Sequence, residues 1–324
     1  MRFVGAEEID RLLSFKTLIP ALETAFLGGI IAPVRHHHHI ARPDADATLL
    51  LMPAWTGPGL TPACEPSYLG TKIVTVFPGN AARSLPSIAG TYLLMDGATG
   101  MPLLAMDGAR LTLWRTAAAS ALASRAMARK DASHMLMVGA GALARFLVEA
   151  HASVKPLTRI EIWNRNRSGA ERVAADLGTR GFNASVSDDL EASARRADLI
   201  SCATLATAPL IMGDWLKPGS HLDLVGAFNL SMREADDAAL HRARVVVDTA
   251  AALTEGGDVA VAIKAGAYAA GQPLGTLSDL VAGKIVPRTS GMDITLFKSV
   301  GASLEDLAAA MLVLRSMPAP AGGD

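Results

Sequence analysis

Cysteine, net charge and long apolar runs are all scarce in this chain, and each scarcity excludes a class of protein. Its 324 residues include two cysteines, Cys64 and Cys202, which form neither a metal-ligand spacing nor a disulfide framework. The net charge of −1 leaves no basic footprint for nucleic acid. No uninterrupted apolar run reaches the roughly 18 residues of a membrane helix, and charged residues between Glu7 and Lys16 interrupt any signal-peptide core. We therefore expect a cytoplasmic globular protein without a membrane or nucleic-acid partner.

The most informative segment that is present is ASHMLMVGAGALARFLVEAH (132–151), followed by RIEIWNRNR (159–167). An apolar stretch, Met135–Val138, leads into the glycine turn GAGALA, a helical stretch and a second apolar stretch, Ile160–Trp163. In this order, G-x-G-x-x-A is a dinucleotide-binding fingerprint. Gly139 permits the tight turn, and Gly141 lets the backbone approach a pyrophosphate at the helix N-terminus. We predict a nucleotide-binding α/β domain; the alternative is an α/β layer without a nucleotide.

The residues after the second of these strands bear on the choice of cofactor. NAD-binding domains typically carry an acidic residue about 20 positions beyond the glycines, where it bonds the ribose 2′-hydroxyl. Here Asn164 stands at that place, with Arg165 and Arg167 beside it. Because a cationic pocket suits a 2′-phosphate, the sequence favours NADP(H), with NAD(H) as a second cofactor.

The N-terminal third of the chain is predicted to form one layer of helices and strands. Apolar spacing predicts a single helix over Ile9–Leu27. An alanine-rich helix is predicted over Leu111–Ala128. Four strands are predicted between these helices, at Ala47–Pro53, Tyr68–Phe77, Gly90–Met95 and Pro102–Met106.

The nucleotide-binding unit is predicted to continue through further buried parallel strands. Apolar runs bounded by turn residues stand at Asp198–Ala203, His221–Gly226 and Arg244–Asp248. Helical stretches are predicted at Ala170–Leu177, Ala260–Ala269 and Leu277–Ala282. The segment Ile294–Leu314 begins as a strand and becomes a helix; we expect it to return to the N-terminal layer. The proline- and glycine-rich tail at 318–323 is expected to be disordered.

Two basic residues in apolar surroundings are candidates for chemistry. Arg115 opens the alanine-rich helix, and its guanidinium suits a substrate carboxylate because it bonds carboxylates bidentately and stays charged. The alternative for Arg115 is a structural ion pair. Lys72 lies within an apolar strand, where desolvation lowers the pKa of a lysine and makes it a candidate proton donor. The alternative is a lysine at a strand end that reaches water.

Other polar groups are assigned structural roles. His36–His39 is interpreted as a surface tract, because alternate residues of a strand face opposite sides and no acidic or cysteine partner is near. We expect no metal site. Cys202 is interpreted as a small buried apolar residue. The pairs Asp188–Asp189 and Asp236–Asp237 are predicted to be solvated or to cap helices, and Glu255–Asp258 is predicted to be a turn without a functional role.

Taken together, the motifs resemble the ornithine cyclodeaminase/μ-crystallin family across nearly the whole chain. The matching segments are PVR (33–35), LLLMPAW (49–55), LGTKIVTVFPGN (69–80), LPSIAGTYLLMDGATGMPL (85–103), LTLWRTAAASALASR (111–125), VGAGALA (138–144), IWNRN (162–166), SCATLATAPLIMGDWLKPGSHLDLVGAF (201–228), MREADD (232–237) and ITLFKSVGASLEDLAAA (294–310). The resemblance implies an α/β fold in which a Rossmann domain, 113–291, is inserted in an α+β substrate-binding and dimerisation domain, 1–112 and 292–324. It also implies a homodimer.

The family contains several activities, and two departures narrow them. Ornithine cyclodeaminases keep tightly bound NAD and use a catalytic aspartate shortly after the strand that matches His221–Gly226; here no aspartate occurs before Asp236. The acidic residue after the second strand is also replaced, by Asn164. With the MREADD and PVRHHH segments, these departures resemble bacterial reductases of cyclic ketimine acids. Those enzymes reduce Δ1-pyrroline-2-carboxylate to L-proline and Δ1-piperideine-2-carboxylate to L-pipecolate with NADPH, often also with NADH.

The resemblance also implies roles for individual residues. Arg35 and Arg115 would hold the substrate carboxylate, and Lys72 would bond that carboxylate or protonate the ring nitrogen, with a water as the alternative acid. Ser87 and Thr116 would line the junction of cofactor and substrate. The residues expected to bind the cofactor are Ser87, Arg115, Thr116, Gly139, Ala140, Gly141, Ala142, Asn164, Arg165, Asn166, Thr204, Leu205, Val225, Ala227 and Ser299.

Two other hypotheses of function stay open at this point. The first is an ornithine cyclodeaminase or an alanine-type dehydrogenase; ammonia release from ornithine without added NADPH would favour it. The second is a protein that binds NADPH and a small hormone-like ligand, as μ-crystallin does; tight NADPH binding without activity would favour it. The presence of Arg35, Lys72 and Arg115 argues against a pure binding protein.

Overall fold

The computed structural model describes residues 1–43, 45–57, 66–83 and 85–318; Cys64 and nearly all of the tail predicted to be disordered lie outside these ranges. The chain divides into two compact units. Unit 1 comprises Met1–Arg115 and Ala302–Asp324, and unit 2 comprises Thr116–Gly301. The boundary falls within helix α3 (Gly108–Met127). Within the described ranges, no helix has the length and apolar character needed to cross a membrane.

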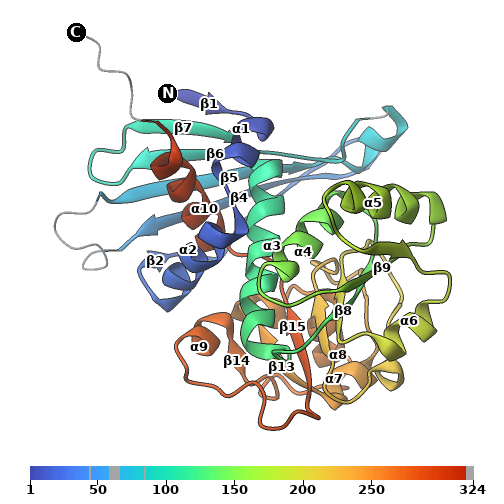
Figure 1. Ribbon diagram of the computed structural model, residues 1–324. Helices are drawn as coiled ribbons and strands as arrows, with labels where there is room; N and C mark the ends of the chain where they lie inside the picture. The colour runs from blue at the N-terminus through green and yellow to red at the C-terminus, as the bar shows by residue number, and fades with distance from the viewer. Residues whose placement is uncertain (44, 58–65, 84, 319–324) are drawn as a thin grey trace. The chain divides into compact units, whose positions relative to one another are not determined.

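Unit 1 is built on a seven-stranded sheet with the order β1-β7-β6-β5-β4-β2, in which β3 also pairs with β4 (Figure 1). Only β1 and β7 pair in parallel; the other pairs are antiparallel. The four strands predicted for this part are confirmed. The strands are β1 (Arg2–Val4), β2 (Ile30–Ile31), β3 (His36–Ile40), β4 (Ala47–Thr56), β5 (Tyr68–Val76), β6 (Ile88–Asp96) and β7 (Pro102–Asp107).

The helices of unit 1 cover one face of this sheet. Helix α10 (Ser303–Ser316) packs against α2 (Phe15–Leu27) and across β4, β5 and β6 (Figure 1). Apolar side chains from helices and sheet fill the space between them, among them Leu18, Leu22 and Leu94. Burial of each such side chain contributes about 1.5–3 kcal/mol. The remaining helical segments of unit 1 are α1 (Ala6–Leu12) and the 3-10 segment η1 (Pro78–Arg83).

The prediction of one helix over Ile9–Leu27 is wrong. The chain forms two helices, α1 and α2, because Leu13 adopts an extended conformation at the end of α1. Ser14 then begins α2 as its N-cap, and its hydroxyl accepts a hydrogen bond from the Thr17 amide at 3.3 Å. Satisfying an amide that lacks a helical partner is the reason serine is favoured at this position. The regular apolar spacing on both sides concealed this capping residue.

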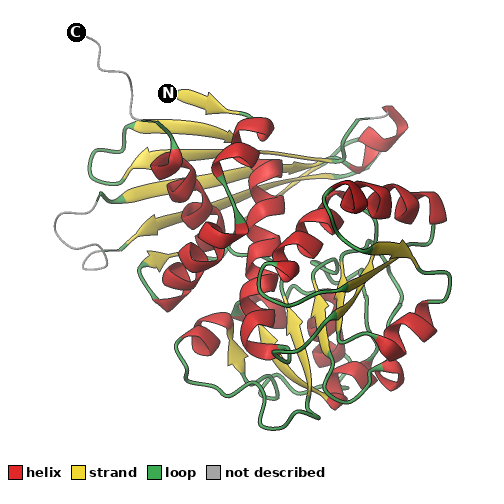
Figure 2. Ribbon diagram, viewed as in Figure 1, coloured by secondary structure: helices red, strands yellow, loops and turns green. Residues whose placement is uncertain are grey.

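Unit 2 is a doubly wound parallel sheet with the order β10-β9-β8-β11-β12-β15-β13-β14. Figure 2 distinguishes its strands from its helices by colour. Every strand pair in it is parallel. Its strands are β8 (His134–Val138), β9 (Arg159–Trp163), β10 (Ala184–Val186), β11 (Leu199–Cys202), β12 (His221–Leu224), β13 (Ala243–Val247), β14 (Gly275–Thr276) and β15 (Ile294–Lys298). Its helical segments after α3 are α4 (Ala142–Ala152), α5 (Arg167–Thr179), α6 (Leu190–Arg196), η2 (Gly213–Trp215), α7 (Asp237–Arg242), η3 (Ala250–Leu253), α8 (Gly257–Lys264) and α9 (Leu277–Val281).

The segment Ile294–Leu314 does not return as a whole to the N-terminal layer, so this expectation is wrong for its first part. Strand β15 lies inside the sheet of unit 2, paired with β12 and β13, and all five of its residues are buried. Only α10 belongs to unit 1. A fully buried apolar strand is typical of the centre of a parallel sheet, but its residues do not indicate which of two sheets it joins. The assignment of the units to substrate and cofactor stays a prediction.

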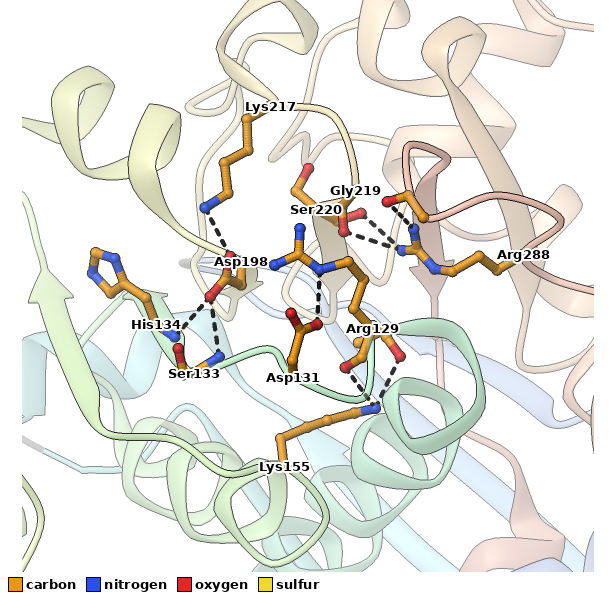
Figure 3. A network of polar contacts seen from close by, with 12 residues as sticks. Arg129, Asp131, Ser133, His134, Lys155, Asp198, Lys217, Gly219, Ser220 and Arg288 are labelled. Atoms are coloured by element: carbon orange, nitrogen blue, oxygen red, sulfur yellow. Dashed lines mark hydrogen bonds and ion pairs between the residues drawn. The ribbon is translucent and has the colours of Figure 1, made fainter.

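A network of polar contacts lies at the amino ends of the strands of the unit 2 sheet (Figure 3). Asp198, which directly precedes β11, accepts hydrogen bonds from the amides of Ser133 and His134 at the start of β8. Lys155 donates to three carbonyl oxygens at the end of α3, those of residues 125, 128 and 129. Arg288 bonds the Met127 carbonyl there as well. These contacts satisfy backbone groups that a helix end leaves without partners.

Candidate active site

Four charged side chains form a buried cluster within unit 1. Lys72 comes from β5, Arg115 from α3, and Glu305 and Asp306 from the first turn of α10. The Lys72 Nζ lies 2.9 Å from Asp306 Oδ1 and 2.8 Å from Asp306 Oδ2. The Arg115 Nε donates to Asp306 Oδ1 at 3.1 Å, and its Nη1 donates to Glu305 Oε2 at 2.8 Å. Two cations and two anions thus compensate each other in a site removed from water.

The environment of Lys72 prepares it to give up a proton. Its side chain is fully buried, and this desolvation, with the nearby charge of Arg115, lowers the pKa of Lys72 to about 8. The charge of Asp306 opposes the shift only in part. A group whose pKa lies near the working pH is the most effective general acid. The prediction that Lys72 is a desolvated lysine is therefore confirmed, whereas its role as proton donor stays a prediction.

The contacts of Arg115 are compatible with both hypotheses for it, the structural ion pair and the carboxylate clamp. Its guanidinium forms ion pairs with Glu305 and Asp306, as the structural hypothesis expected. Such pairs also fix a planar group in one orientation, which a carboxylate-binding site requires. A role for Arg115 in binding the substrate stays a prediction.

Two residues of this cluster, and a tyrosine opposite Lys72, were missed by the sequence analysis. Glu305 and Asp306 stand where acidic residues commonly complement a helix N-terminus at the surface, yet both are buried. The signal for them was an acidic pair inside the otherwise apolar segment 304–313. Tyr92 lies opposite Lys72 in the pairing of β5 and β6, fully buried. Gly70 admits its ring, because a Cβ there would lie 2.0 Å from the Tyr92 hydroxyl oxygen.

The other candidate residues of unit 1 lie in its loops. Arg35 is half-buried and directly precedes β3. Ser87 is half-buried and directly precedes β6, and its carbonyl oxygen accepts a hydrogen bond from the Phe77 amide at 2.7 Å. His36–His39 form the exposed part of β3. No group of three or more histidine, cysteine, aspartate or glutamate side chains with the placement of a metal site occurs among the described residues.

The predicted cofactor residues of unit 2 gather at one edge of its sheet. Because all strands are parallel, their carboxyl ends share that edge, and β8 and β11 are the neighbours at which the strand order reverses. Thr116, by contrast, lies within α3 and is buried. The residues at the edge are Gly139, Ala140, Gly141 and Ala142 after β8, Asn164, Arg165 and Asn166 after β9, Thr204 and Leu205 after β11, Val225 and Ala227 after β12, and Ser299 after β15.

The glycine turn after β8 has the geometry that a dinucleotide requires. Gly139 has a φ of +108°, and a Cβ there would lie 2.4 Å from the Ala203 carbonyl oxygen, so no other residue fits. Gly141 is the N-cap of α4, makes no side-chain cap, and would present a Cβ to open space. The first amides of α4 are therefore accessible to an anion such as a pyrophosphate.

The segment after β9 offers one cation for a 2′-phosphate. The Asn164 side chain donates to the Asn166 carbonyl oxygen at 2.8 Å, and the Asn166 side chain caps α5. Arg167 forms ion pairs with Glu171 and Asp188. Arg165 is exposed, and no carboxylate within the described ranges pairs with it. Of the two arginines expected at a cationic pocket, Arg165 is thus the one without a competing anion.

Four further residues of unit 2 correct or confirm what the sequence predicted. Asp258 is not part of a surface turn; it lies in the first turn of α8 and is fully buried. Helix α8 begins at Gly257, three residues before the predicted helix start, and the Asp258 carboxylate accepts hydrogen bonds from the buried amides of Glu234 and Ala235. Asp189 and Asp236 cap α6 and α7, as predicted. Cys202 is buried in β11, also as predicted.

A two-unit chain with a doubly wound nucleotide-binding sheet and a second α+β unit defines a class of NAD-binding oxidoreductase folds. The model of the ornithine cyclodeaminase/mu-crystallin family matches residues 2–319. The chain belongs to this family, and the predicted α/β fold with a Rossmann domain is confirmed.

Relatives with curated names match along the whole chain. Protein SAR DEFICIENT 4 of Arabidopsis thaliana is 41% identical over 319 residues, 96% of each chain. The Δ1-pyrroline-2-carboxylate reductase of Colwellia psychrerythraea is 34% identical over 325 residues, 98% of this chain and 99% of that protein. The ketimine reductase mu-crystallin of Mus musculus is 34% identical over 323 residues, 97% of this chain and 96% of that protein.

Solved structures agree with the fold. The Thermococcus litoralis Δ1-pyrroline-2-carboxylate reductase, solved with NADH and L-proline, superposes with a TM-score of 0.89 at 30% identity and covers 98% of this chain and 97% of that one. An archaeal alanine dehydrogenase dimer with bound NAD superposes with a TM-score of 0.87 at 28% identity, over 97% of this chain and 95% of that one.

Proposed function

We propose that the protein reduces cyclic ketimine acids with a reduced nicotinamide cofactor, converting Δ1-pyrroline-2-carboxylate to L-proline and Δ1-piperideine-2-carboxylate to L-pipecolate. The observation that carries the proposal is the buried cluster in which Asp306 bonds both Arg115 and Lys72, whose pKa is lowered to about 8. A proton donor beside an arginine matches the two functional groups of the substrate, a ring imine and a carboxylate. Relatives named as reductases of such imines support it.

The residues act on the two ends of the substrate. When bound, the dihydronicotinamide supplies a hydride, which forms the new C–H bond at the imine carbon. Lys72 Nζ donates a proton to the ring nitrogen, so that the C=N bond becomes a C–N bond with an N–H. Arg115 and Arg35 bind the carboxylate and fix the ring. Asp306 orients the Lys72 Nζ by accepting its hydrogen bond.

The test is oxidation of NADPH and NADH with four substrates in parallel: pyrroline-2-carboxylate, piperideine-2-carboxylate, pyruvate with amines, and ornithine. We expect rapid oxidation with the two cyclic imines and little with the others. Ammonia release from ornithine without added reduced cofactor would instead show a cyclodeaminase. Tight cofactor binding with no turnover of any substrate would show a binding protein. Either result would overturn the proposal.

We further propose that NADPH is preferred over NADH, on the basis of Arg165 and of Asn164 in place of an acidic residue. Arg165→Gln should lower kcat/KM for NADPH about tenfold, because a charged hydrogen bond to phosphate contributes on the order of 1.5–3 kcal/mol, and leave NADH nearly unchanged. Arg167→Gln is the matched control, since Arg167 already pairs with Glu171. Asn164→Asp should shift preference towards NADH. Equal kcat/KM for both cofactors in the wild type would contradict the preference.

A further inference from the structure

Three charged side chains are fully buried below the carboxyl edge of the unit 2 sheet: Glu234, Asp258 and Lys298. Glu234 precedes α7, Asp258 lies at the start of α8, and Lys298 ends β15. With two carboxyl groups and one amino group, this cluster contains more acidic than basic side chains. Burying such groups is costly, so their contacts indicate what the arrangement achieves.

The Glu234 carboxylate joins two loops that follow neighbouring strands. Its Oε1 accepts hydrogen bonds from the Thr204 amide at 2.7 Å and the Thr204 hydroxyl at 2.8 Å. Its Oε2 accepts from the amides of Gly226 at 2.7 Å and Ala227 at 3.2 Å. Thr204 follows β11, and Gly226 and Ala227 follow β12. One side chain therefore fixes the spacing of both main chains.

A second layer of contacts holds Glu234 itself. Asp258 Oδ1 accepts hydrogen bonds from the amides of Glu234 at 2.7 Å and Ala235 at 3.0 Å. Asp258 Oδ2 pairs with the Lys298 Nζ at 3.1 Å. The close fit depends on Gly226, where a Cβ would lie 2.4 Å from Glu234 Oε1. The carboxylate is thus fixed from below while its oxygens reach the two loops.

These loops lie where one half of a dinucleotide would rest. In a doubly wound sheet the cofactor lies across the carboxyl edge at the point where the strand order reverses. The glycine turn after β8 suits the pyrophosphate, and the segment after β9 suits the adenosine ribose. The nicotinamide half then extends over the loops after β11 and β12, on the other side of β8.

We propose that Glu234 is a positioning residue for the nicotinamide half of the cofactor, holding the loops after β11 and β12 at the spacing that the bound ring requires. The inference rests on the cofactor part of the proposed function and is independent of the imine substrate. A carboxylate is needed because it accepts from four donors. In Glu234→Gln, the new amide N–H groups would face either the Thr204 amide or the amides of Gly226 and Ala227.

The experiment compares Glu234→Gln with Asp236→Asn in the full-length chain. Asp236 is a matched control because its carboxylate also bonds backbone amides, those of Gly213 and Ala239, but none of the amides that Glu234 holds. Cofactor affinity is measured from the fluorescence of NADH during titration, without substrate, and folding is followed by circular dichroism during thermal unfolding.

Glu234→Gln should weaken NADH binding by about tenfold or more, the effect of leaving one buried donor unsatisfied. Asp236→Asn should lower the unfolding temperature but change NADH affinity by no more than about twofold, because its carboxylate bonds neither Thr204 nor the amides of Gly226 and Ala227. A folded Glu234→Gln variant with wild-type affinity would overturn the assignment. An equal loss of affinity in Asp236→Asn would overturn it too, because general loosening would then explain both.

Acidification supplies a second readout, which also decides the matter if Glu234→Gln does not fold. Burial raises the pKa of Glu234 to about 7. The charge of Lys298 opposes this increase, and the charge of Asp258 adds to it. Burial raises the pKa of the Cys202 thiol, and the charge of Glu234 adds to this increase. Because a protonated carboxyl loses acceptor capacity, NADH affinity of the wild type should fall as the pH drops below about 7, whereas Glu234→Gln should lack this step.

NADH is the probe because it has no 2′-phosphate to titrate. Wild-type affinity that stays constant through this range would overturn the proposal, and a wild type that binds neither NADH nor NADPH would overturn the proposed function as well.

Discussion

At the scale of single residues, the Asp306 carboxylate connects the two cations of the unit 1 cluster, because it bonds both Lys72 and Arg115. Asp306→Asn keeps the shape but removes the charge and replaces one acceptor by a donor. We expect kcat/KM for imine reduction to fall about tenfold to a hundredfold, since a charged hydrogen bond contributes roughly 1.5–3 kcal/mol. Steady-state kinetics with both cyclic imines measure this loss. An unchanged kcat/KM would show that Lys72 needs no such support.

The lowered pKa of Lys72 predicts a pH dependence of the reaction. A general acid must be protonated, so kcat/KM should be constant at low pH and fall about tenfold per unit as the pH rises above about 8. Asp306 raises the pKa of Lys72, so Asp306→Asn should move this limb to lower pH. A profile without the limb, or one that Asp306→Asn leaves in place, would assign the proton to another donor such as water.

Buried charged residues show which parts of the candidate site the sequence can predict. Lys72 and Arg115 were identifiable because a charge inside an apolar stretch is unusual. Their partners Glu305 and Asp306 were not, because acidic residues in the first turn of a helix are ordinary at a surface. Glu234 was hidden for a similar reason: only the spatial arrangement of the loops after β11 and β12 makes it a hydrogen-bond acceptor for both.

At the scale of elements, a buried lysine caps the end of α3, together with Arg288. Lys155 is 5% exposed and donates to three carbonyl oxygens there, a favourable place for a cation at a helix C-terminus (Figure 3). Lys155→Met should lower the free energy of unfolding by about 1–3 kcal/mol, because buried acceptors lose their donor. Urea unfolding measures the change. The exposed neighbour Lys130 is the control, and Lys130→Met should stay within about 0.5 kcal/mol of the wild type. Equal effects of the two variants would contradict the capping role.

Secondary structure itself was largely predictable, and the exceptions have local causes. Strands β4–β7, β8, β9 and β11–β13 follow apolar runs that are visible in the sequence, whereas the break between α1 and α2 depends on the single cap at Ser14. The register of the β5–β6 pair, which sets Tyr92 against Lys72, follows from long-range pairing that no local pattern encodes.

At the scale of the whole molecule, the sheet of unit 1 indicates a partner surface. Ile73 alternates with the helix-facing Lys72, so it lies on the opposite face, paired with Leu51 across the strands and only half-buried. We propose that this face forms a homodimer; the solved alanine dehydrogenase neighbour is itself a dimer. Light scattering at micromolar concentration should give twice the chain mass for the wild type and the chain mass for Ile73→Asp. Val286→Asp, at an exposed apolar residue of unit 2, should leave the mass unchanged. A monomeric wild type would contradict the proposal.

The placement of α10 has a consequence for how the protein is made. The ribosome completes the sheet of unit 1 and all of unit 2 before it makes the helix that covers that sheet and supplies Glu305 and Asp306. Until then, the nascent chain presents an uncovered apolar face and two basic side chains, Lys72 and Arg115, without these partners. Synthesis proceeds at roughly 5–20 residues per second, so this vulnerable state lasts on the order of ten seconds or more. The nascent protein is therefore expected to depend on chaperones most strongly until α10 has been made.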